Sequence, residues 1–242
     1  MTTIPRKLRS FAFLIVALSL ISAGAGGDQA NAPPLKLDGK LVCIGASITV
    51  GEGVKPADCY VGLLKAKAKA ENLNLEIIGQ GRSGWSTGAY VHNEAKVVEA
   101  MPADATIVTI LLGTNDCREE GSPEEVGERA AQNLGKLIDM YAAKAPHAQF
   151  IVISPTKCYP ERLTKRLLDA HYGSSTPEKL KAITKGFEAL AKGRGLRFID
   201  LSAVPSSADN SIDGIHVKAA GHQQIFDAIW NCLSAAAPTT GP

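Results

Sequence analysis

Short runs of branched apolar residues alternate along this chain with segments of helical periodicity, and this alternation limits the fold more than any other feature. The longest run, residues 105–112, is continuous enough for a central strand covered on both faces. Strands are expected at residues 41–44, 75–78, 105–112, 150–154 and 196–199, and helices at 57–71, 88–101, 123–144, 177–192 and 218–233. Such alternation favours an α/β fold in which helices cover both faces of a five-stranded parallel sheet.

The N-terminus has the composition of a secretory signal peptide. Basic residues at positions 6, 7 and 9 precede an apolar run over residues 11–23, which is shorter than the roughly 20 residues of a membrane span. Small residues after this run offer cleavage sites, so we expect residues 1–32 to be a signal peptide with a short leader. The mature protein is then exported to the periplasm or secreted, with one domain over 36–234 and a disordered tail over 235–242. An uncleaved membrane anchor is the alternative.

The charges of the chain are nearly balanced, with 26 Lys and Arg residues against 24 Asp and Glu residues. Such a balance does not indicate binding to nucleic acid or to an anionic membrane surface. We therefore expect neither a nucleic-acid partner nor stable membrane association. The sequence does not indicate an oligomeric state.

Five cysteines in an exported chain leave at least one thiol unpaired. Cys43 lies inside the first apolar run and is expected to be a buried free thiol. Cys117 and Cys158 follow two successive strands and would lie at the same edge of the sheet if those strands are neighbours. We predict a disulfide between Cys117 and Cys158. No Cys or His pair has the spacing of metal ligands, so no metal site is expected.

Four short segments carry residues with the chemistry of acyl transfer. They are Gly45–Thr49, Ser83-Gly84, Gly113–Asp116 and Asp213–His216. The first three follow the carboxyl ends of the first three expected strands, which is where active sites of open parallel sheets lie. The fourth occupies the loop before the last helix. We therefore expect these segments to meet at one edge of the sheet.

Ser47, His216 and Asp213 have the properties of a nucleophile, a general base and a residue that orients the base. Ser47 lies three residues after the first strand, on a tight turn that Gly45 opens. A serine needs a neighbouring base to become a good nucleophile. Because Asp213 and His216 are three residues apart, the carboxylate can bind one imidazole nitrogen while the other nitrogen faces the serine. Asp209 is the second choice for the carboxylate.

Gly84 and Asn115 are candidate donors for an oxyanion hole. A tetrahedral intermediate needs preorganised hydrogen-bond donors where its oxygen gains charge. The glycine allows a close approach of its backbone N–H, and the asparagine offers a side-chain amide. Together with the backbone N–H of Ser47 they make three donors. A plain turn is the alternative for residues 113–116, because Gly, Asn and Asp favour turns.

Two other motifs match the sequence only in part. Residues 79–84 have the glycine spacing of a dinucleotide-binding fingerprint, but they follow the second expected strand and not the first. The nucleophile elbow G-x-S-x-G fails because Thr49 stands where its second glycine belongs. We therefore do not expect a nucleotide cofactor.

In their order and spacing, the four segments resemble those of the SGNH (GDSL-type) hydrolase family. The name-giving residues of that family match Ser47, Gly84, Asn115 and His216, with Asp213 as the third member of a triad. The resemblance implies a flavodoxin-like three-layer α/β/α sandwich and ester hydrolysis without a metal or an organic cofactor. It also implies an oxyanion hole formed by Ser47 N–H, Gly84 N–H and the Asn115 side chain.

Within this family the chain is most similar to exported carbohydrate O-acetyl esterases. The residues after Ser47 and the Gly-Thr-Asn-Asp segment favour this group, and the loops expected near the site are polar. Ala46 departs from the family, which often has Asp before the serine. Trp85, Tyr60 and Tyr159 lie on site-side segments and are candidates to stack against a sugar ring, with buried packing as the alternative for each. The expected substrate is a small acyl ester or an acetylated glycan.

Two other functions use the same residues. A thioesterase or lysophospholipase would prefer long acyl chains, and a catalytically silent relative would bind glycans without turning them over. The presence of Ser47, Asn115, Asp213 and His216 argues against a silent protein. The sequence does not identify the sugar or the linkage.

Overall fold

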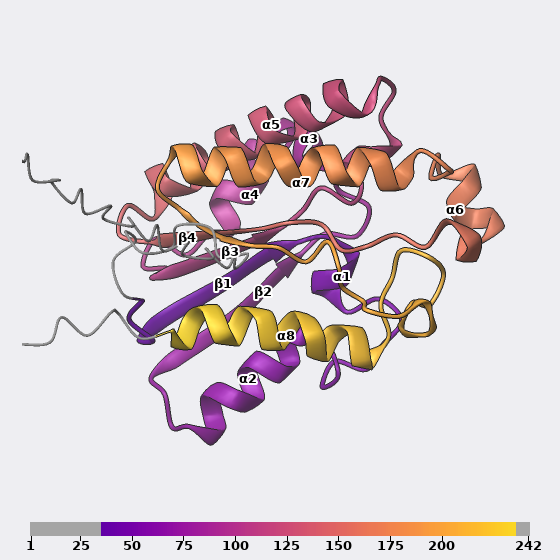
Figure 1. The fold of residues 1–242 in the computed structure, drawn as a ribbon. Helices are drawn as coiled ribbons and strands as arrows, with labels where there is room; N and C mark the ends of the chain where they lie inside the picture. Colours follow the sequence, from indigo (N-terminus) through magenta and orange to yellow (C-terminus); the bar gives the residue numbers. More distant parts are fainter. Residues whose placement is uncertain (1–34, 236–242) are drawn as a thin grey trace, which may run out of the picture.

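The computed structural model describes residues 35–235, and within them a single five-stranded sheet forms the centre of the molecule (Figure 1). The strands are β1 (Gly39–Gly45), β2 (Leu75–Gly81), β3 (Ile107–Leu111), β4 (Gln149–Ile153) and β5 (Arg197–Ile199). They are all parallel, in the order β2-β1-β3-β4-β5, which is the flavodoxin-like order. The predicted sheet is therefore confirmed. The predicted signal segment and the tail beyond Ala235 lie outside the described residues.

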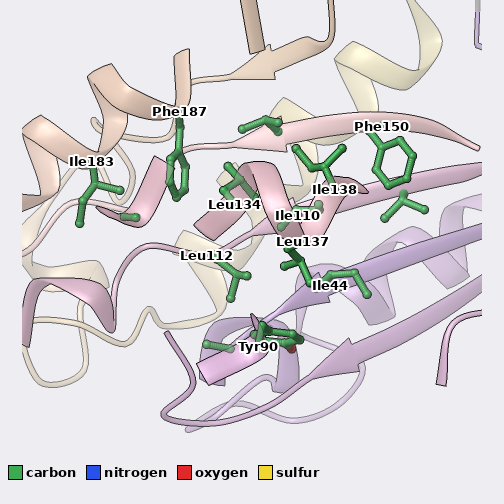
Figure 2. Close-up of a cluster of buried hydrophobic side chains, with 14 of the residues drawn as sticks. Ile44, Tyr90, Ile110, Leu112, Leu134, Leu137, Ile138, Phe150, Ile183 and Phe187 are labelled. Carbon is green, nitrogen blue, oxygen red and sulfur yellow. The ribbon is translucent and has the colours of Figure 1, made fainter. Parts of the chain in front are cut away.

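Helices cover both faces of the sheet and complete the expected three layers (Figure 1). One layer consists of α2 (Tyr60–Ala70) and α8 (Ala219–Ser234), and the other of α3 (Thr87–His92), α4 (Glu94–Ala100), α5 (Pro123–Lys144) and α7 (Thr176–Gly193). Alternate residues of β1 serve the two layers: Leu41 packs with the α2 and α8 side, and Val42 with the other. Figure 2 shows the core on the α5 side, where Phe187 and Leu134 are fully buried.

Helix boundaries agree closely with the sequence pattern, with one exception. Ser122 caps α5 through a capping box with Glu125, and Pro123 occupies the first turn. The single helix predicted over 88–101 is wrong, because α3 and α4 are separated at Asn93. The Asn93 amide donates to the Ala89 carbonyl at 2.9 Å while its own backbone leaves the helical region.

Several short elements lie in connections that have no periodic pattern in the sequence. They are α1 (Ser47–Val50), α6 (Lys165–Asp169) and the 3-10 turns η1 (Asp116–Arg118), η2 (Pro160–Arg162) and η3 (Ala208–Asn210). Most of them surround the carboxyl edge of the sheet. Among residues 35–235, no helix is both long and apolar enough to cross a membrane.

The disulfide predicted between Cys117 and Cys158 is wrong for this structure, in which both thiols are free and buried. The Cys117 thiol turns back toward the segment before η1 and donates to the Thr114 carbonyl at 2.7 Å. Both cysteines instead contribute to the apolar core beside α5 and α7. Cys43 is a buried free thiol, as predicted.

Candidate active site

Ser47 is the first residue of α1, directly beyond the carboxyl end of β1. The turn requires Gly45, because a Cβ there would collide with the Thr49 side chain and lie 2.8 Å from the Leu111 carbonyl oxygen. The backbone N–H at the first position of a helix has no acceptor within that helix. Ser47 therefore presents both its hydroxyl and its N–H at the edge of the sheet.

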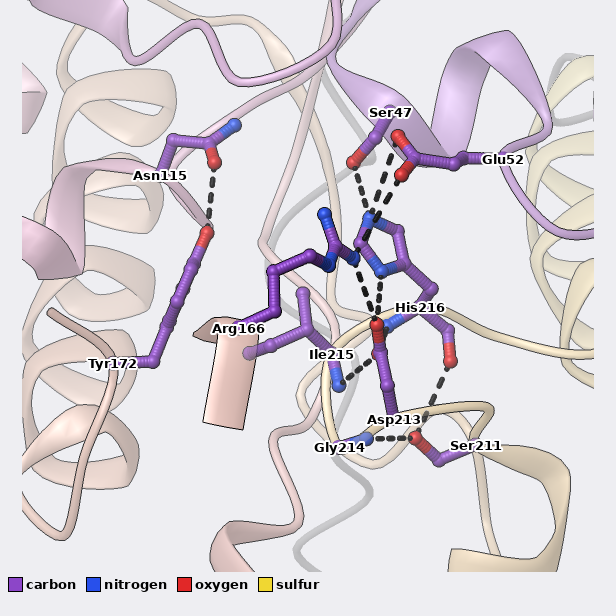
Figure 3. A network of polar contacts seen from close by, with 10 residues as sticks. All are labelled: Ser47, Glu52, Asn115, Arg166, Tyr172, Ser211, Asp213, Gly214, Ile215 and His216. Atoms are coloured by element: carbon purple, nitrogen blue, oxygen red, sulfur yellow. Dashed lines mark hydrogen bonds and ion pairs between the residues drawn. The ribbon is translucent and has the colours of Figure 1, made fainter. Parts of the chain in front are cut away.

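His216 joins Ser47 to Asp213 in a continuous chain of hydrogen bonds (Figure 3). Its Nε2 atom lies 2.9 Å from Ser47 Oγ, and its Nδ1 atom lies 2.8 Å from Asp213 Oδ2. All three residues are less than a tenth exposed. The structure thus brings together the three predicted residues with the spacing that proton transfer from serine to histidine requires.

Asp213 is held as a carboxylate by the peptide that follows it. Its Oδ1 accepts the backbone N–H groups of His216 at 2.8 Å and Ile215 at 3.1 Å. Burial acts to raise the pKa of Asp213, but the hydrogen bonds from the side chain and backbone of His216 outweigh it, and the pKa falls to about 2. Asp209, the second choice, is exposed and pairs with Arg162 at 2.6 Å, away from the imidazole.

The loop that carries Asp213 and His216 is shaped by its neighbours. Gly214 has φ +96°, and a Cβ there would lie 2.7 Å from the Tyr159 carbonyl oxygen. The backbone N–H of Tyr159 donates to the Gly214 carbonyl at 2.9 Å, and Ser211 Oγ accepts from Gly214 N–H. The Tyr159 backbone therefore packs against this loop and holds it through a hydrogen bond. The Tyr159 hydroxyl donates to the Pro205 carbonyl, so the prediction that Tyr159 stacks on substrate is wrong.

Gly84 and Asn115 line the same pocket as Ser47 and His216, so the structure brings the predicted oxyanion donors to the nucleophile. Gly84 adopts φ +78°, a conformation that favours glycine, and a Cβ there would meet nothing within 4 Å. Backbone conformation, and not lack of space, is therefore the reason for a glycine. The Asn115 amide donates one hydrogen bond to the Trp85 carbonyl at 2.9 Å, which leaves its second N–H for the pocket.

Asp116 ties the loop after β2 to the loop after β3. Both of its carboxylate oxygens lie 3.1 Å from the Thr87 backbone nitrogen, and the Thr87 hydroxyl also donates to it. Burial raises the pKa of Asp116 to about 6 against these hydrogen bonds. The two loops that carry Gly84 and Asn115 are thus held together by a buried contact.

Residues outside the predicted catalytic and oxyanion set form the rest of the pocket wall. The pocket has a volume of about 270 Å³, and its further lining residues are Glu52, Ser83, Arg118, Arg166, Leu167, Ala170 and Tyr172. Arg166 lies 3.3 Å from Asp213 and 3.9 Å from Glu52, whose other oxygen is 3.8 Å from His216 Nε2. These side chains come from the loop after α1, from the loop after β2, from η1 and from the connection around α6, which show no periodic pattern that could have marked them.

The prediction that Tyr60 stacks against a sugar ring is wrong. Neither Tyr60 nor Trp85 is among the described residues that line the pocket. Tyr60 is fully buried on α2, and its hydroxyl lies 2.8 Å from Thr49 Oγ1. Trp85 is half-buried, with the Arg82 guanidinium 5.0 Å from its ring and the Tyr90 ring against its edge. A role for Trp85 in substrate binding stays a prediction.

Within residues 35–235, no cluster of three or more His, Cys, Asp or Glu side chains could hold a metal ion.

His222 is a buried histidine behind the site, where its Nδ1 accepts the Tyr60 backbone N–H at 3.3 Å. Burial, and secondarily the nearby His216, lowers the pKa of His222 from 6.5 to about 4. Between pH 6.5 and 4 the unfolded chain therefore binds the proton and the folded chain does not, so folding loses stability as the pH falls. In a His222→Gln variant this loss disappears.

We expect the difference in free energy of unfolding between the wild type and His222→Gln to shift against the wild type by about 3 kcal/mol between pH 7 and pH 4. Urea unfolding at several pH values measures it. Asp116 titrates in the same range but is present in both proteins, so its contribution cancels in the difference. A difference that is equal at pH 7 and pH 4 would contradict this account of His222.

Comparison with known proteins identifies the family of the chain. The model of the GDSL-like Lipase/Acylhydrolase family matches residues 43–224, a segment that contains all of the residues placed in the site above. GDSL lipase Rv0518 of Mycobacterium tuberculosis (strain ATCC 25618 / H37Rv) is 24% identical over 236 residues, which cover 91% of this chain and 95% of the relative.

Solved structures share the fold. Est24, a carbohydrate acetylesterase from Sinorhizobium meliloti, superposes with a TM-score of 0.64 at 22% identity, covering 81% of this chain and 98% of that one. The M. smegmatis aryl esterase gives a TM-score of 0.64 at 21% identity, covering 80% and 97%. The family match spans most of the domain and includes the serine, the glycine, the asparagine and the histidine, so this chain belongs to the GDSL-like lipase/acylhydrolase family.

Proposed function

We propose that this hydrolase cleaves esters of small acyl groups, chiefly acetyl, on polyhydroxy compounds such as carbohydrates, with Ser47 as nucleophile. His216 takes the Ser47 proton as the hydroxyl oxygen attacks the ester carbonyl, and Asp213 stabilises the imidazolium that forms. The oxyanion accepts hydrogen bonds from the N–H groups of Ser47 and Gly84 and from the Asn115 amide. His216 then protonates the leaving alcohol, and water hydrolyses the acyl-enzyme by the reverse sequence.

The observation that carries the proposal is the unbroken contact from Ser47 Oγ through His216 to Asp213, at 2.9 Å and 2.8 Å, beside two further predicted donors. A serine after a strand has many structural uses, but a hydrogen bond to an imidazole that is itself bound to a buried carboxylate serves nucleophilic catalysis.

The size and lining of the pocket support a small acyl group on a polar alcohol. Its volume of about 270 Å³ is slightly below the 300–1,000 Å³ usual for small-molecule sites. Its apolar wall consists of Leu167, Ala170 and the Tyr172 ring, whereas Glu52, Arg118 and other polar groups form the remainder. A short acyl chain fits the apolar wall, and sugar hydroxyls fit the charged rim.

One observation favours longer acyl chains as a second candidate. The large hydrophobic side chains that are exposed among residues 35–235 are Val50, Leu168 and Ile212. Each lies within three positions of a pocket or triad residue in the sequence. A lipid or thioester substrate could extend its chain over these side chains. The relative described as a GDSL lipase is consistent with such a substrate.

Hydrolysis of p-nitrophenyl acetate, butyrate and octanoate separates the two candidates. We expect kcat/KM to fall steeply from acetate to octanoate, and Leu167→Ala to relax this preference because it enlarges the apolar wall. Leu168→Ala is the matched control, since the neighbouring side chain is 51% exposed and does not line the pocket. A wild-type preference for octanoate that Leu168→Ala reduces would replace the small-acyl proposal with the lipid or thioester function.

Serine-dependent activity on none of the three esters would instead favour a glycan-binding relative. The proposal also includes export, which rests on the basic and apolar N-terminal sequence outside the described residues. The mass of the protein recovered from the periplasm or the medium, compared with that of the full chain, tests both export and cleavage near residue 32.

A further inference from the structure

Tyr172 contacts the Asn115 side chain directly, although 57 residues separate them in the sequence. Its hydroxyl donates to Asn115 Oδ1 at 2.7 Å, and both side chains are only 6% exposed (Figure 3). Tyr172 lies between α6 and α7, so this contact joins two separate connections at the carboxyl edge of the sheet. The Tyr172 ring is part of the apolar wall of the pocket, but the mechanism described above assigns no role to its hydroxyl.

The two ends of the Asn115 amide are held by different partners. The carbonyl end accepts from Tyr172, while one N–H of the other end donates to the Trp85 carbonyl at 2.9 Å. Rotation of the amide by half a turn would bring its N–H₂ group to the Tyr172 hydroxyl and its oxygen to the Trp85 carbonyl oxygen. The second contact would pair two acceptors, so Tyr172 and Trp85 together fix which end of Asn115 faces the pocket.

Arg118 joins the loop after β2, which carries Gly84, to the loop after β3, which carries Asn115. Its Nη2 atom donates to the backbone carbonyl of Gly84 at 2.6 Å, and its Nε atom donates to the backbone carbonyl of Asn115 at 3.1 Å. Its guanidinium lies 5.9 Å from the centre of the Tyr172 ring. Within the part of the chain that the structure describes, Arg118 forms no ion pair with a carboxylate, so its charged donors serve these carbonyls.

We propose that Tyr172 and Arg118 act as a brace, two positioning residues that fix Gly84 and Asn115 at the spacing an oxyanion requires. This inference rests on the proposed role of Gly84 and Asn115 as oxyanion donors. Donors stabilise a developing charge fully only when they are preorganised, and a displacement of about 1 Å can cost about 100-fold in rate. The brace acts on the transition state through the donors and does not itself touch the reacting atoms.

Tyr172→Phe removes the hydroxyl and keeps the ring, so it tests the brace with the least disturbance. We expect kcat for p-nitrophenyl acetate to fall by about 10-fold to 100-fold with KM changed less than about 2-fold, because a misplaced donor weakens only the transition state. Tyr141→Phe is the matched control, since it removes a hydroxyl from another buried tyrosine, on α5 and outside the pocket lining. Its kcat should equal that of the wild type.

A double-mutant cycle with Asn115→Ala distinguishes positioning from a general structural effect. If Tyr172 acts through Asn115, then Tyr172→Phe lowers kcat by less than about 2-fold once Asn115 is already alanine. An equal loss in both backgrounds would overturn the proposal. Arg118→Lys keeps the charge but cannot reach both carbonyls in the same way, and it should show a KM-neutral loss of kcat even if Tyr172→Phe fails to fold.

The cycle also separates failure of the brace from failure of the proposed function. Asn115→Ala alone should lower kcat by about 10²-fold to 10³-fold if its amide serves the oxyanion. Unchanged kcat in that variant would remove Asn115 from the oxyanion hole and the brace with it. A large loss in Asn115→Ala together with wild-type kcat in both Tyr172→Phe and Arg118→Lys would overturn the brace alone.

Discussion

Replacement of Ser47 by alanine is expected to lower kcat/KM for p-nitrophenyl acetate by about 10⁴-fold or more while the fold stays intact. The reason is that Ser47 Oγ is the only hydroxyl within hydrogen-bond distance of His216 Nε2 among residues 35–235, at 2.9 Å. Without it no acyl-enzyme can form, and only the oxyanion donors and substrate binding remain to assist attack by water. Steady-state hydrolysis and the thermal unfolding midpoint, measured on the same preparation, test both parts of the prediction.

Ser202→Ala is the control for Ser47→Ala, because Ser202 is exposed beyond β5 and does not line the pocket. The mass of the intact protein during turnover provides a second readout: an acetyl adduct should accumulate on the wild type or on Ser202→Ala and be absent from Ser47→Ala. Retention of most of the activity by Ser47→Ala would disprove the serine mechanism, whatever the substrate.

The sheet could be predicted because each strand is marked by a local run of apolar residues in the sequence. The run that contains Ile107 and Leu111 is apolar on both faces, as a central strand requires, and the structure places it between β1 and β4. Ser122 marks the start of α5 in the same local way. The interruption at Asn93 could not be predicted, because it depends on a side-chain hydrogen bond that competes with helix continuation.

The central residues of the site could also be predicted, since Ser47 and Asn115 follow strand ends that parallel pairing brings together. Tyr172 and Arg166 could not, because each reaches its partner across a long sequence separation from a connection without periodicity. The error at Tyr60 has a different cause. Its position near the site was right, but sequence position does not give side-chain direction, and the ring turns into the core.

Asp213→Asn should lower kcat by about 10⁴-fold although it is nearly isosteric. In the wild type the Asp213 carboxylate accepts the Nδ1 proton of His216, so Nε2 is free to accept from Ser47. An asparagine can present its N–H₂ group at the same place, which favours the imidazole tautomer with its proton on Nε2. That tautomer cannot take the proton of Ser47. Steady-state kinetics of Asp213→Asn measure the effect, and Asp209→Asn is the matched control because that carboxylate is exposed and bound to Arg162.

Asp213→Asn should also change how the stability of the fold depends on pH in acid, because the pKa of Asp213 is lowered in the folded protein. Because this pKa is lowered to about 2, the folded wild type keeps the carboxylate ionised where the unfolded chain takes up a proton. The resulting stabilisation is present above about pH 4 and is lost as the pH falls toward 2. The stability of Asp213→Asn should lack this contribution, so the two unfolding profiles should converge at low pH. Wild-type activity in Asp213→Asn with converging profiles would mean that Asp213 stabilises the loop without directing the imidazole, and it would leave Ser47 and His216 as a dyad.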